Sequence, residues 1–214
     1  SLQLILSAGE ALSPEVAKEL KKISKAKLIN IYGPTEAAIY ATWLDTNALD
    51  EGYKENYISI GRPLSETEIY ILDEYMRPVP PMVAGDLYIG GKGVATGYLN
   101  RDDLTEKVFV NNPFSDETGA RLYKTGDLAC FQQDGNVRFL GRADNQVKVR
   151  GYRVELEGIE SVMMQVDGVQ DCAVKAYGAS AQGQRLVAYY VADHDFDETI
   201  LKKAICAALP QYMM

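Results

Sequence analysis

Hydrophobic positions in the first forty residues pass from a strand-like run to a helical spacing and back. Residues 2–6 are mostly apolar, and Ser7-Ala8-Gly9 ends this run. Ser13 followed by Pro14 is typical of a helix N-cap and first helical position, and apolar side chains then recur on one side of the next ten residues. Residues 28–32 form a second apolar run that ends at Gly33-Pro34. The pattern predicts two parallel strands connected by a helix.

The pattern changes from about residue 57 onwards, where short strand-like runs alternate with Gly and Pro. Residues 67–72 and 86–89 have the composition of strands, and residues 136–140 alternate directly after the turn pair Asp134-Gly135. An Asp-Gly pair followed by alternating side chains predicts a β-hairpin. We therefore expect a β-rich, barrel-like subdomain over residues 57–143.

A third pattern begins near residue 144. Residues 146–149, 173–174 and 186–191 resemble strands, whereas apolar side chains recur at helical spacing over 156–166 and 200–208. The predicted fold class is thus an α/β part (1–56), the β-rich subdomain (57–143) and a small α+β domain (144–214). The first run resembles the middle of a fold and the last residues show no domain end, so the sequence predicts a piece of a longer protein.

Composition and charge narrow the classes of partner. The 214 residues carry a formal net charge of −8, which disfavours nucleic acid as a partner, and the chain contains neither an apolar run of membrane-spanning length nor a signal peptide. Three widely spaced cysteines, Cys130, Cys172 and Cys206, match no metal-ligand spacing and predict buried, reduced thiols in a cytoplasmic protein. His194 is the only histidine and lacks a matching nucleophile motif.

The first chemically unusual cluster covers residues 30–36, Asn-Ile-Tyr-Gly-Pro-Thr-Glu. A strand that ends in Gly-Pro exposes the residues that follow it, here the Thr35 hydroxyl and the Glu36 carboxylate. A carboxylate can hold Mg²⁺, which in turn binds phosphates, and the Tyr32 ring offers a stacking face to a base. An ordinary turn before a helix is an equally good interpretation of this cluster taken alone.

Two further clusters follow. In residues 123–128, Tyr-Lys-Thr-Gly-Asp-Leu, Asp127 beside a glycine turn can accept hydrogen bonds from two ribose hydroxyls, although a simple turn aspartate is the more common case. Residues 141–155 carry four cations within twelve positions of an acidic chain, either as a solvated strand face or as phosphate ligands. The glycine-rich residues 90–98 lack the spacing of known phosphate-binding loops and predict a tight surface loop.

In their order and separation, these clusters resemble the adenylate-forming superfamily, and most closely the adenylation domains of non-ribosomal peptide synthetases. The motifs that carry the resemblance are Asn-Ile-Tyr-Gly-Pro-Thr-Glu, Gly-Tyr-Leu-Asn-Arg, Tyr-Lys-Thr-Gly-Asp-Leu, Asp-Asn-Gln-Val-Lys-Val-Arg-Gly-Tyr-Arg-Val-Glu and Leu-Pro-Gln-Tyr-Met. The likeness extends from about Leu4 to the last residue. The segment from Asp144 is its most specific part.

The resemblance implies ATP and Mg²⁺ as cofactors and assigns roles to particular residues. Thr35 is expected at the α-phosphate, Glu36 at Mg²⁺ and Asp127 at the ribose hydroxyls. The other implied nucleotide-binding residues are Asn30, Tyr32, Gly33, Phe139 and Arg142. Phe139 replaces a common tyrosine of the family. Asp144 corresponds to a hinge, and Lys148, Arg150 and Gly151 to a loop used in the thioester step, in which a phosphopantetheine on a peptidyl carrier protein domain accepts the amino acid.

The resemblance also implies a substrate pocket at five positions without charge, namely Leu6, Ala8, Ile31, Ile39 and Tyr40. They predict a neutral, apolar amino acid, because a buried unpaired charge is costly. The family's phosphate loop and catalytic lysine are expected outside this chain, so the fragment alone is predicted to be inactive. Three alternatives remain open: a D-alanine–carrier ligase, an acyl-CoA synthetase, and a non-catalytic fragment that docks a carrier protein. Secondary metabolite biosynthesis is the implied context.

Overall fold

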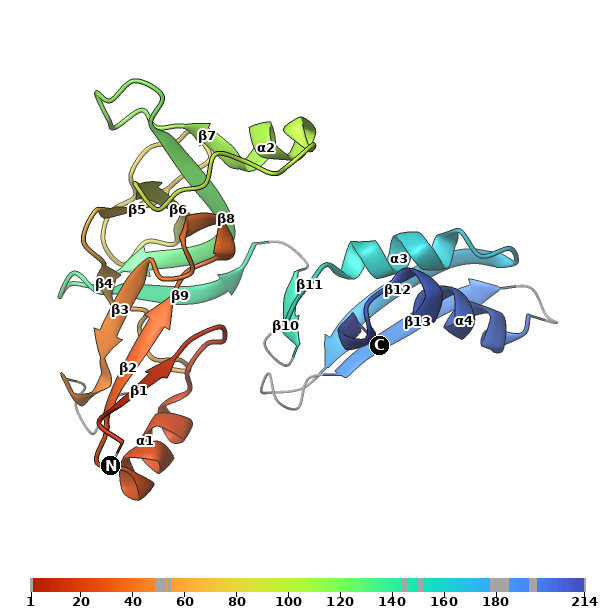
Figure 1. Cartoon of the computed structure of the whole chain (residues 1–214), viewed down its shortest axis with the longest axis horizontal. Helices are drawn as coiled ribbons and strands as arrows, with labels where there is room; N and C mark the ends of the chain where they lie inside the picture. The colour runs from red at the N-terminus through yellow and green to blue at the C-terminus, as the bar shows by residue number, and fades with distance from the viewer. Residues whose placement is uncertain are drawn as a thin grey trace. The chain divides into compact units, whose positions relative to one another are not determined.

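The chain divides into two compact units, Ser1–Ala143 and Asp144–Met214, in a computed structural model (Figure 1). The structure describes residues 2–48, 53, 55–143, 146–149, 152–177, 185–192 and 196–213. Asp144, Arg150, Gly151 and His194 lie outside the described residues. The further prediction that 1–56 and 57–143 form separate parts stays a prediction.

The first sheet of the N-terminal unit contains the predicted strand–helix–strand unit. Strand β1 (Leu4–Ser7) pairs in parallel with β2 (Lys27–Tyr32), and helix α1 (Pro14–Ile23) connects them. The Ser13 side chain accepts a hydrogen bond from the Val16 N–H, so the predicted N-cap is confirmed. Strands β3 (Thr42–Asp45) and β4 (Arg62–Pro63) complete the sheet in the order β1-β2-β3-β4. Two short 3₁₀ turns, Thr35–Ala37 and Thr46–Ala48, flank β3.

The second sheet of this unit is antiparallel and has five strands. Strands β5 (Thr67–Leu72), β6 (Gly85–Gly91), β8 (Arg121–Phe131) and β7 (Phe109–Asn111) follow one another, and β9 (Val137–Arg142) also pairs with β8. The β8–β9 connection contains Asp134-Gly135, with Gly135 at a φ of 81°, which confirms the predicted hairpin. Helix α2 (Asp102–Val108), which the sequence pattern did not reveal, precedes β7.

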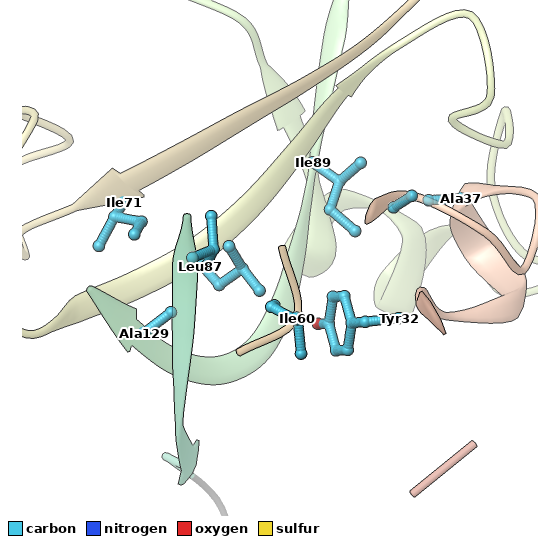
Figure 2. Close-up of a cluster of buried hydrophobic side chains, with 9 residues drawn as sticks. Tyr32, Ala37, Ile60, Ile71, Leu87, Ile89 and Ala129 are labelled. Atoms are coloured by element: carbon cyan, nitrogen blue, oxygen red, sulfur yellow. The ribbon is translucent and has the colours of Figure 1, made fainter. Parts of the chain in front are cut away.

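One hydrophobic cluster joins the two sheets of the N-terminal unit. Tyr32, Ala37 and Ala41 come from the first sheet and its turn, and they pack with buried side chains of the second sheet. Figure 2 shows Tyr32 beside Ile60, with Leu87 and Ile89 of β6 in the same cluster. Burial of these side chains fixes one sheet against the other, and thereby fixes the loops at their edges.

The C-terminal unit is a small α+β arrangement. A hairpin of β10 (Val147–Val149) and β11 (Tyr152–Val154) leads into helix α3 (Leu156–Met164). Strands β12 (Val169–Tyr177) and β13 (Arg185–Ala192) pair antiparallel, and helix α4 (Glu198–Ala208) follows before the turn Gln211–Met213. Side chains of both helices and both strands share one core around Met163.

The structure also bears on the predictions about the cysteines and about membrane-spanning segments. Cys130 is buried as predicted, but the prediction is wrong for Cys206, which is exposed on α4. None of the three cysteines forms a disulfide bond. In the part of the chain that the structure describes, no helix is long and apolar enough to cross a membrane.

Candidate nucleotide-binding site

Asp127 is a buried acidic side chain of the N-terminal unit. It lies on β8 opposite Arg142 of β9, and its side chain is almost completely buried. The Arg142 Nη1 donates to Asp127 Oδ1 at 2.9 Å and also to the Thr125 carbonyl at 2.9 Å. The Tyr32 hydroxyl donates to Asp127 Oδ2. The carboxylate is therefore held at both oxygens by two different elements.

The surroundings of Asp127 differ from the expected glycine turn. Residues 121–131 form one continuous strand, and Gly126 takes a φ of 75° within it. The pairing between β6 and β8 is irregular near this glycine, as is usual where a left-handed residue interrupts a ladder. The expectation of a turn at this position was wrong, because pairing with β6 and β9 on both sides keeps the chain extended.

Thr125 is a residue whose role the sequence did not reveal. Its hydroxyl donates to the Leu87 carbonyl at 2.8 Å and accepts from the Asp127 N–H at 3.0 Å. Thr125 thus links β8 to β6 where the strand pairing is irregular beside Gly126, and it fixes the backbone that carries Asp127. Its place in the Tyr-Lys-Thr-Gly-Asp-Leu motif was the available signal.

Tyr32 occupies the end of β2 and is 9% exposed. Burial, the negative charge of Asp127 and the hydrogen bond to it raise the pKa of Tyr32 well above its ordinary value. Its ring centroid lies 6.4 Å from that of Phe139, which is half-buried on β9. The two predicted aromatic residues are thus neighbours. Stacking of Tyr32 on adenine and a place for Phe139 beside the nucleotide stay predictions.

Asn30 lies on the same strand face as Tyr32, but its amide already has partners. Its Nδ2 donates to the Ser59 carbonyl at 2.9 Å and to the Ile58 carbonyl at 3.4 Å. The side chain is 2% exposed. These bonds tie β2 to the segment before β4, a structural role that the sequence did not indicate. The predicted contact with adenine is untested.

The turn that follows β2 presents Thr35 and Glu36 in a 3₁₀ conformation. The Ala37 and Ile39 N–H groups both donate to the Pro34 carbonyl. Ala38 and Ile39 then adopt left-handed φ values of 58° and 71°. A β-branched residue such as Ile39 takes this conformation only where the surrounding structure imposes it. Strain of this kind is often found at functional loops.

Gly33 makes this tight turn possible. A Cβ atom at this position would lie 2.5 Å from the Ile39 carbonyl oxygen and 2.7 Å from the Ala41 nitrogen, and both are backbone atoms. The chain therefore closes on itself where only glycine fits. Gly33 is thus required by the turn, while a contact with nucleotide remains a prediction.

Glu36 is half-buried and has a phenol partner that the sequence did not predict. The Tyr98 hydroxyl donates to Glu36 Oε1 at 2.6 Å, and the Ala95 N–H donates to the Glu36 carbonyl at 2.9 Å. Tyr98 belongs to the glycine-rich segment that was expected to be only a surface loop. That expectation was incomplete, since the segment packs on the Thr35–Ala37 turn. The Gly-Tyr-Leu-Asn-Arg motif was the signal, although it gave no role to Tyr98.

The five predicted pocket residues fall in two groups. Leu6 pairs with Ile29, so it lies on the same face of the first sheet as Ile31. Ala8 follows β1, while Ile39 and Tyr40 follow the Thr35–Ala37 turn. Leu6, Ile39 and Tyr40 are each about half exposed. Leu6 and Ile31 thus lie on strands, whereas Ala8, Ile39 and Tyr40 lie in the connections that follow, and a pocket formed by the five stays a prediction.

The positions assigned to the thioester step lie in the C-terminal unit. The structure describes the backbone of Lys148, which pairs with Arg153 in the β10–β11 hairpin, but not its side chain. Asp144, Arg150 and Gly151 are outside the described residues, so the hinge and loop assignments remain predictions. Among the described residues, no group of three His, Cys, Asp or Glu side chains could hold a metal ion alone.

Comparison with known proteins identifies the family. The sequence profile described as AMP-binding enzyme matches residues 1–99. Malpibaldin synthetase from Mortierella alpina is 43% identical over 215 aligned residues, which cover 100% of this chain and 4% of that protein. Residues 1–99 thus carry the sequence pattern of the AMP-binding enzymes. The resemblance to peptide synthetase adenylation domains is thereby confirmed.

Solved structures of proteins with adenylation domains have the same fold. PA1221, described as a peptide synthetase protein containing adenylation and PCP domains, matches with a TM-score of 0.82 at 30% identity over 99% of this chain and 41% of its own. The Vibrio cholerae adenylation domain AlmE, in complex with glycyl-adenosine-5′-phosphate, matches with a TM-score of 0.86 at 28% identity over 99% of this chain and 40% of its own. The predicted fold class, an incomplete adenylate-forming fold, is confirmed. The chain spans less than half of either protein.

Proposed function

We propose that this chain is part of an enzyme that activates an amino acid with ATP. The amino acid carboxylate attacks the α-phosphorus of ATP, the bond to the β-phosphate oxygen breaks, and aminoacyl-AMP and pyrophosphate form. The observation that carries the proposal is the Asp127 carboxylate, which is held by Arg142 and Tyr32. The match of residues 1–99 to the AMP-binding enzymes supports it. Buried carboxylates are usually paired, and this one lies within a motif that the family associates with nucleotide.

The acceptor capacity of Asp127 fits a ribose. A carboxylate has about four acceptor sites, and the described bonds from Arg142 and Tyr32 occupy one on each oxygen. Two vicinal hydroxyls require two more. Thr35, exposed on its turn, donates to the α-phosphate in this proposal, while Asn30, Tyr32 and Phe139 surround the adenine.

The turn also fits a magnesium ion. Mg²⁺ is commonly bound by one or two carboxylates together with substrate phosphates, so the single carboxylate of Glu36 beside Thr35 is sufficient on the protein side. When bound there, the ion supplies positive charge to the phosphate oxygens. On the protein side, Glu36 accepts a hydrogen bond from the Tyr98 hydroxyl, and Pro34 and Gly33 hold the turn.

A second half-reaction follows in this proposal. The thiol of a phosphopantetheine on a carrier protein domain attacks the aminoacyl carbonyl, a thioester forms and AMP leaves. The adenylation and PCP domains present together in PA1221 support a carrier partner. Lys148, Arg150 and Gly151 then serve the thioester step, and Asp144 serves as the hinge, in line with the position of the boundary between the two units.

The substrate proposed is a neutral, apolar amino acid. Leu6, Ala8, Ile31, Ile39 and Tyr40 carry no charge, and burying an unpaired ionised side chain among them would cost several kcal/mol. An apolar side chain would instead gain roughly 25 cal/mol for each Å² removed from water. The glycyl adenylate bound to AlmE is a small neutral relative of such a substrate.

ATP–pyrophosphate exchange on the full-length protein tests the function and the substrate together. We expect exchange with one or a few apolar amino acids, and a large decrease in the Glu36→Gln variant. Exchange stimulated by fatty acids would favour an acyl-CoA synthetase, and D-alanine as the sole substrate would favour a D-alanine–carrier ligase. A clear preference for Asp, Glu, Lys or Arg would contradict the pocket. Absence of exchange with every acid would leave the non-catalytic docking role.

A further inference from the structure

The strongest unassigned feature near the proposed site is the side chain of Tyr98. Its segment follows β6 of the five-stranded sheet and returns to the turn that carries Glu36. The Tyr98 hydroxyl donates to Glu36 Oε1 at 2.6 Å, although the two residues are 62 positions apart in sequence. A long-range bond between a phenol and a half-buried carboxylate requires both side chains to be placed accurately.

The ring of Tyr98 is fixed by packing. It meets Phe109 edge-on, with centroids 5.5 Å apart and an interplanar angle of 70°. Phe109 in turn lies 5.1 Å from the ring of Tyr123, which is fully buried on β8. The Tyr98 backbone N–H donates to the Thr105 hydroxyl of α2 at 2.9 Å. These contacts give the phenol one orientation before any ligand binds.

A phenol hydroxyl is protonated at neutral pH, because its ordinary pKa is about 10. The Tyr98 hydroxyl therefore acts as the donor in its bond to Glu36 Oε1. A donor on Oε1 fixes the rotamer of the Glu36 carboxylate relative to the turn.

We propose that Tyr98 is a positioning residue that orients the Glu36 carboxylate for the divalent cation of the nucleotide complex. The inference rests on the proposed function and extends it to the glycine-rich segment, to which the sequence gave no chemical role. Partners that orient a metal-binding side chain commonly change metal affinity or activity by 10–100-fold when removed. The hydroxyl of Tyr98 is such a partner, since its ring is packed separately.

The experiment compares Tyr98→Phe with a matched control, Tyr70→Phe, in the full-length protein. Tyr70 also donates its hydroxyl to a carboxylate, Glu68 Oε2 at 3.0 Å, and its ring stacks on Phe114 at 4.7 Å. Both variants lose one phenol oxygen and retain the ring. Manganese binding in the presence of ATP, followed by electron paramagnetic resonance, reports on the cation site without turnover. The magnesium dependence of pyrophosphate exchange is the second readout.

We expect Tyr98→Phe to weaken manganese binding by about 10-fold and to raise the magnesium concentration for half-maximal exchange similarly. ATP binding without metal should change less than 3-fold, and Tyr70→Phe should match the wild type throughout. If Tyr98→Phe binds manganese like the Tyr70→Phe control, the inference is wrong. A wild type without exchange activity would contradict the proposed function instead.

A double-mutant cycle separates positioning from a general structural effect. If Tyr98 acts through Glu36, adding Tyr98→Phe to Glu36→Gln should weaken manganese binding by less than 2-fold further. If Tyr98→Phe instead weakens binding by the same factor in both backgrounds, the residue acts on the fold rather than on the carboxylate, and the inference fails.

Discussion

Replacing Asp127 separates the structural role of this carboxylate from its proposed role in binding. Asp127→Ala removes the ion pair with Arg142 and the acceptor of the Tyr32 hydroxyl, whereas Asp127→Asn keeps the shape and loses the charge. Both partners lie close to Asp127 in a buried position, with the Arg142 Nη1 at 2.9 Å from Oδ1. The two variants therefore remove different parts of one network.

The magnitude follows from the burial of each partner. Removing one member of a fully buried pair costs about 3–5 kcal/mol. The Arg142 side chain is 18% exposed and keeps its bond to the Thr125 carbonyl, so part of its charge stays solvated. We expect Asp127→Ala to lower the free energy of unfolding by about 2–4 kcal/mol, and Asp127→Asn by about 1–2 kcal/mol, because a neutral amide still accepts from Arg142.

Urea unfolding of the 214-residue chain measures the change in stability, and calorimetric ATP binding to the full-length protein measures the change in ATP affinity. Asp127→Ala should weaken ATP binding by about 1.5–3 kcal/mol, the range for a hydrogen bond to a charged group. Unchanged stability would refute the network. Reduced stability with unchanged ATP affinity would refute the ribose assignment and leave the structural role intact.

Two further predictions concern the end of β2. Gly33→Ala should lower the free energy of unfolding by about 1–3 kcal/mol, because the added Cβ would overlap backbone atoms at 2.5 and 2.7 Å. In the control Gly93→Ala, the nearest atom to the added Cβ lies at 3.5 Å, so the free energy of unfolding should change by less than about 0.5 kcal/mol. Equal urea midpoints for the two variants would contradict this. The raised pKa of Tyr32 stabilises the fold fully below about pH 10, and this contribution is lost as the pH rises towards the higher folded-state value. Tyr32→Phe should therefore make the fall in stability above pH 10 shallower by up to about 1.4 kcal/mol per pH unit in urea unfolding, and an unchanged slope would show that Tyr32 titrates normally.

Some elements could be predicted because a local sequence signal marks them. Ser13-Pro14 marks the start of α1, and Asp134-Gly135 marks the β8–β9 hairpin, because capping and turn geometry depend on neighbouring residues only. Asp127 and Glu36 were likewise predicted as chemically special from their motifs. The backbone around Asp127 was not predicted, since Gly126 suggested a turn, whereas pairing on both sides keeps β8 extended there.

The partners of the site residues depend on long-range packing and could not be predicted. Nothing near Glu36 in sequence indicates Tyr98, and nothing near Asn30 indicates that its amide binds the Ser59 carbonyl. Helix α2 was also missed, since its seven residues include no buried side chain and so show no apolar stripe. In each case the deciding contact joins segments that are close only in the folded chain.

Each of the two carboxylates of the proposed site accepts a hydrogen bond from a tyrosine that belongs to, or follows, a strand of the other sheet in the N-terminal unit. Tyr32 belongs to the first sheet and donates to Asp127 of the second, whereas Tyr98 follows a strand of the second sheet and donates to Glu36, which follows a strand of the first. Asp127 is held in addition by Arg142 of its own sheet. The hydrophobic cluster of Figure 2 lies between these sheets and includes Tyr32 itself, so its packing sets the separation between the proposed ribose and metal ligands. Dense cores transmit small changes in side-chain volume, and the geometry of this site is therefore a property of the core as much as of its motifs.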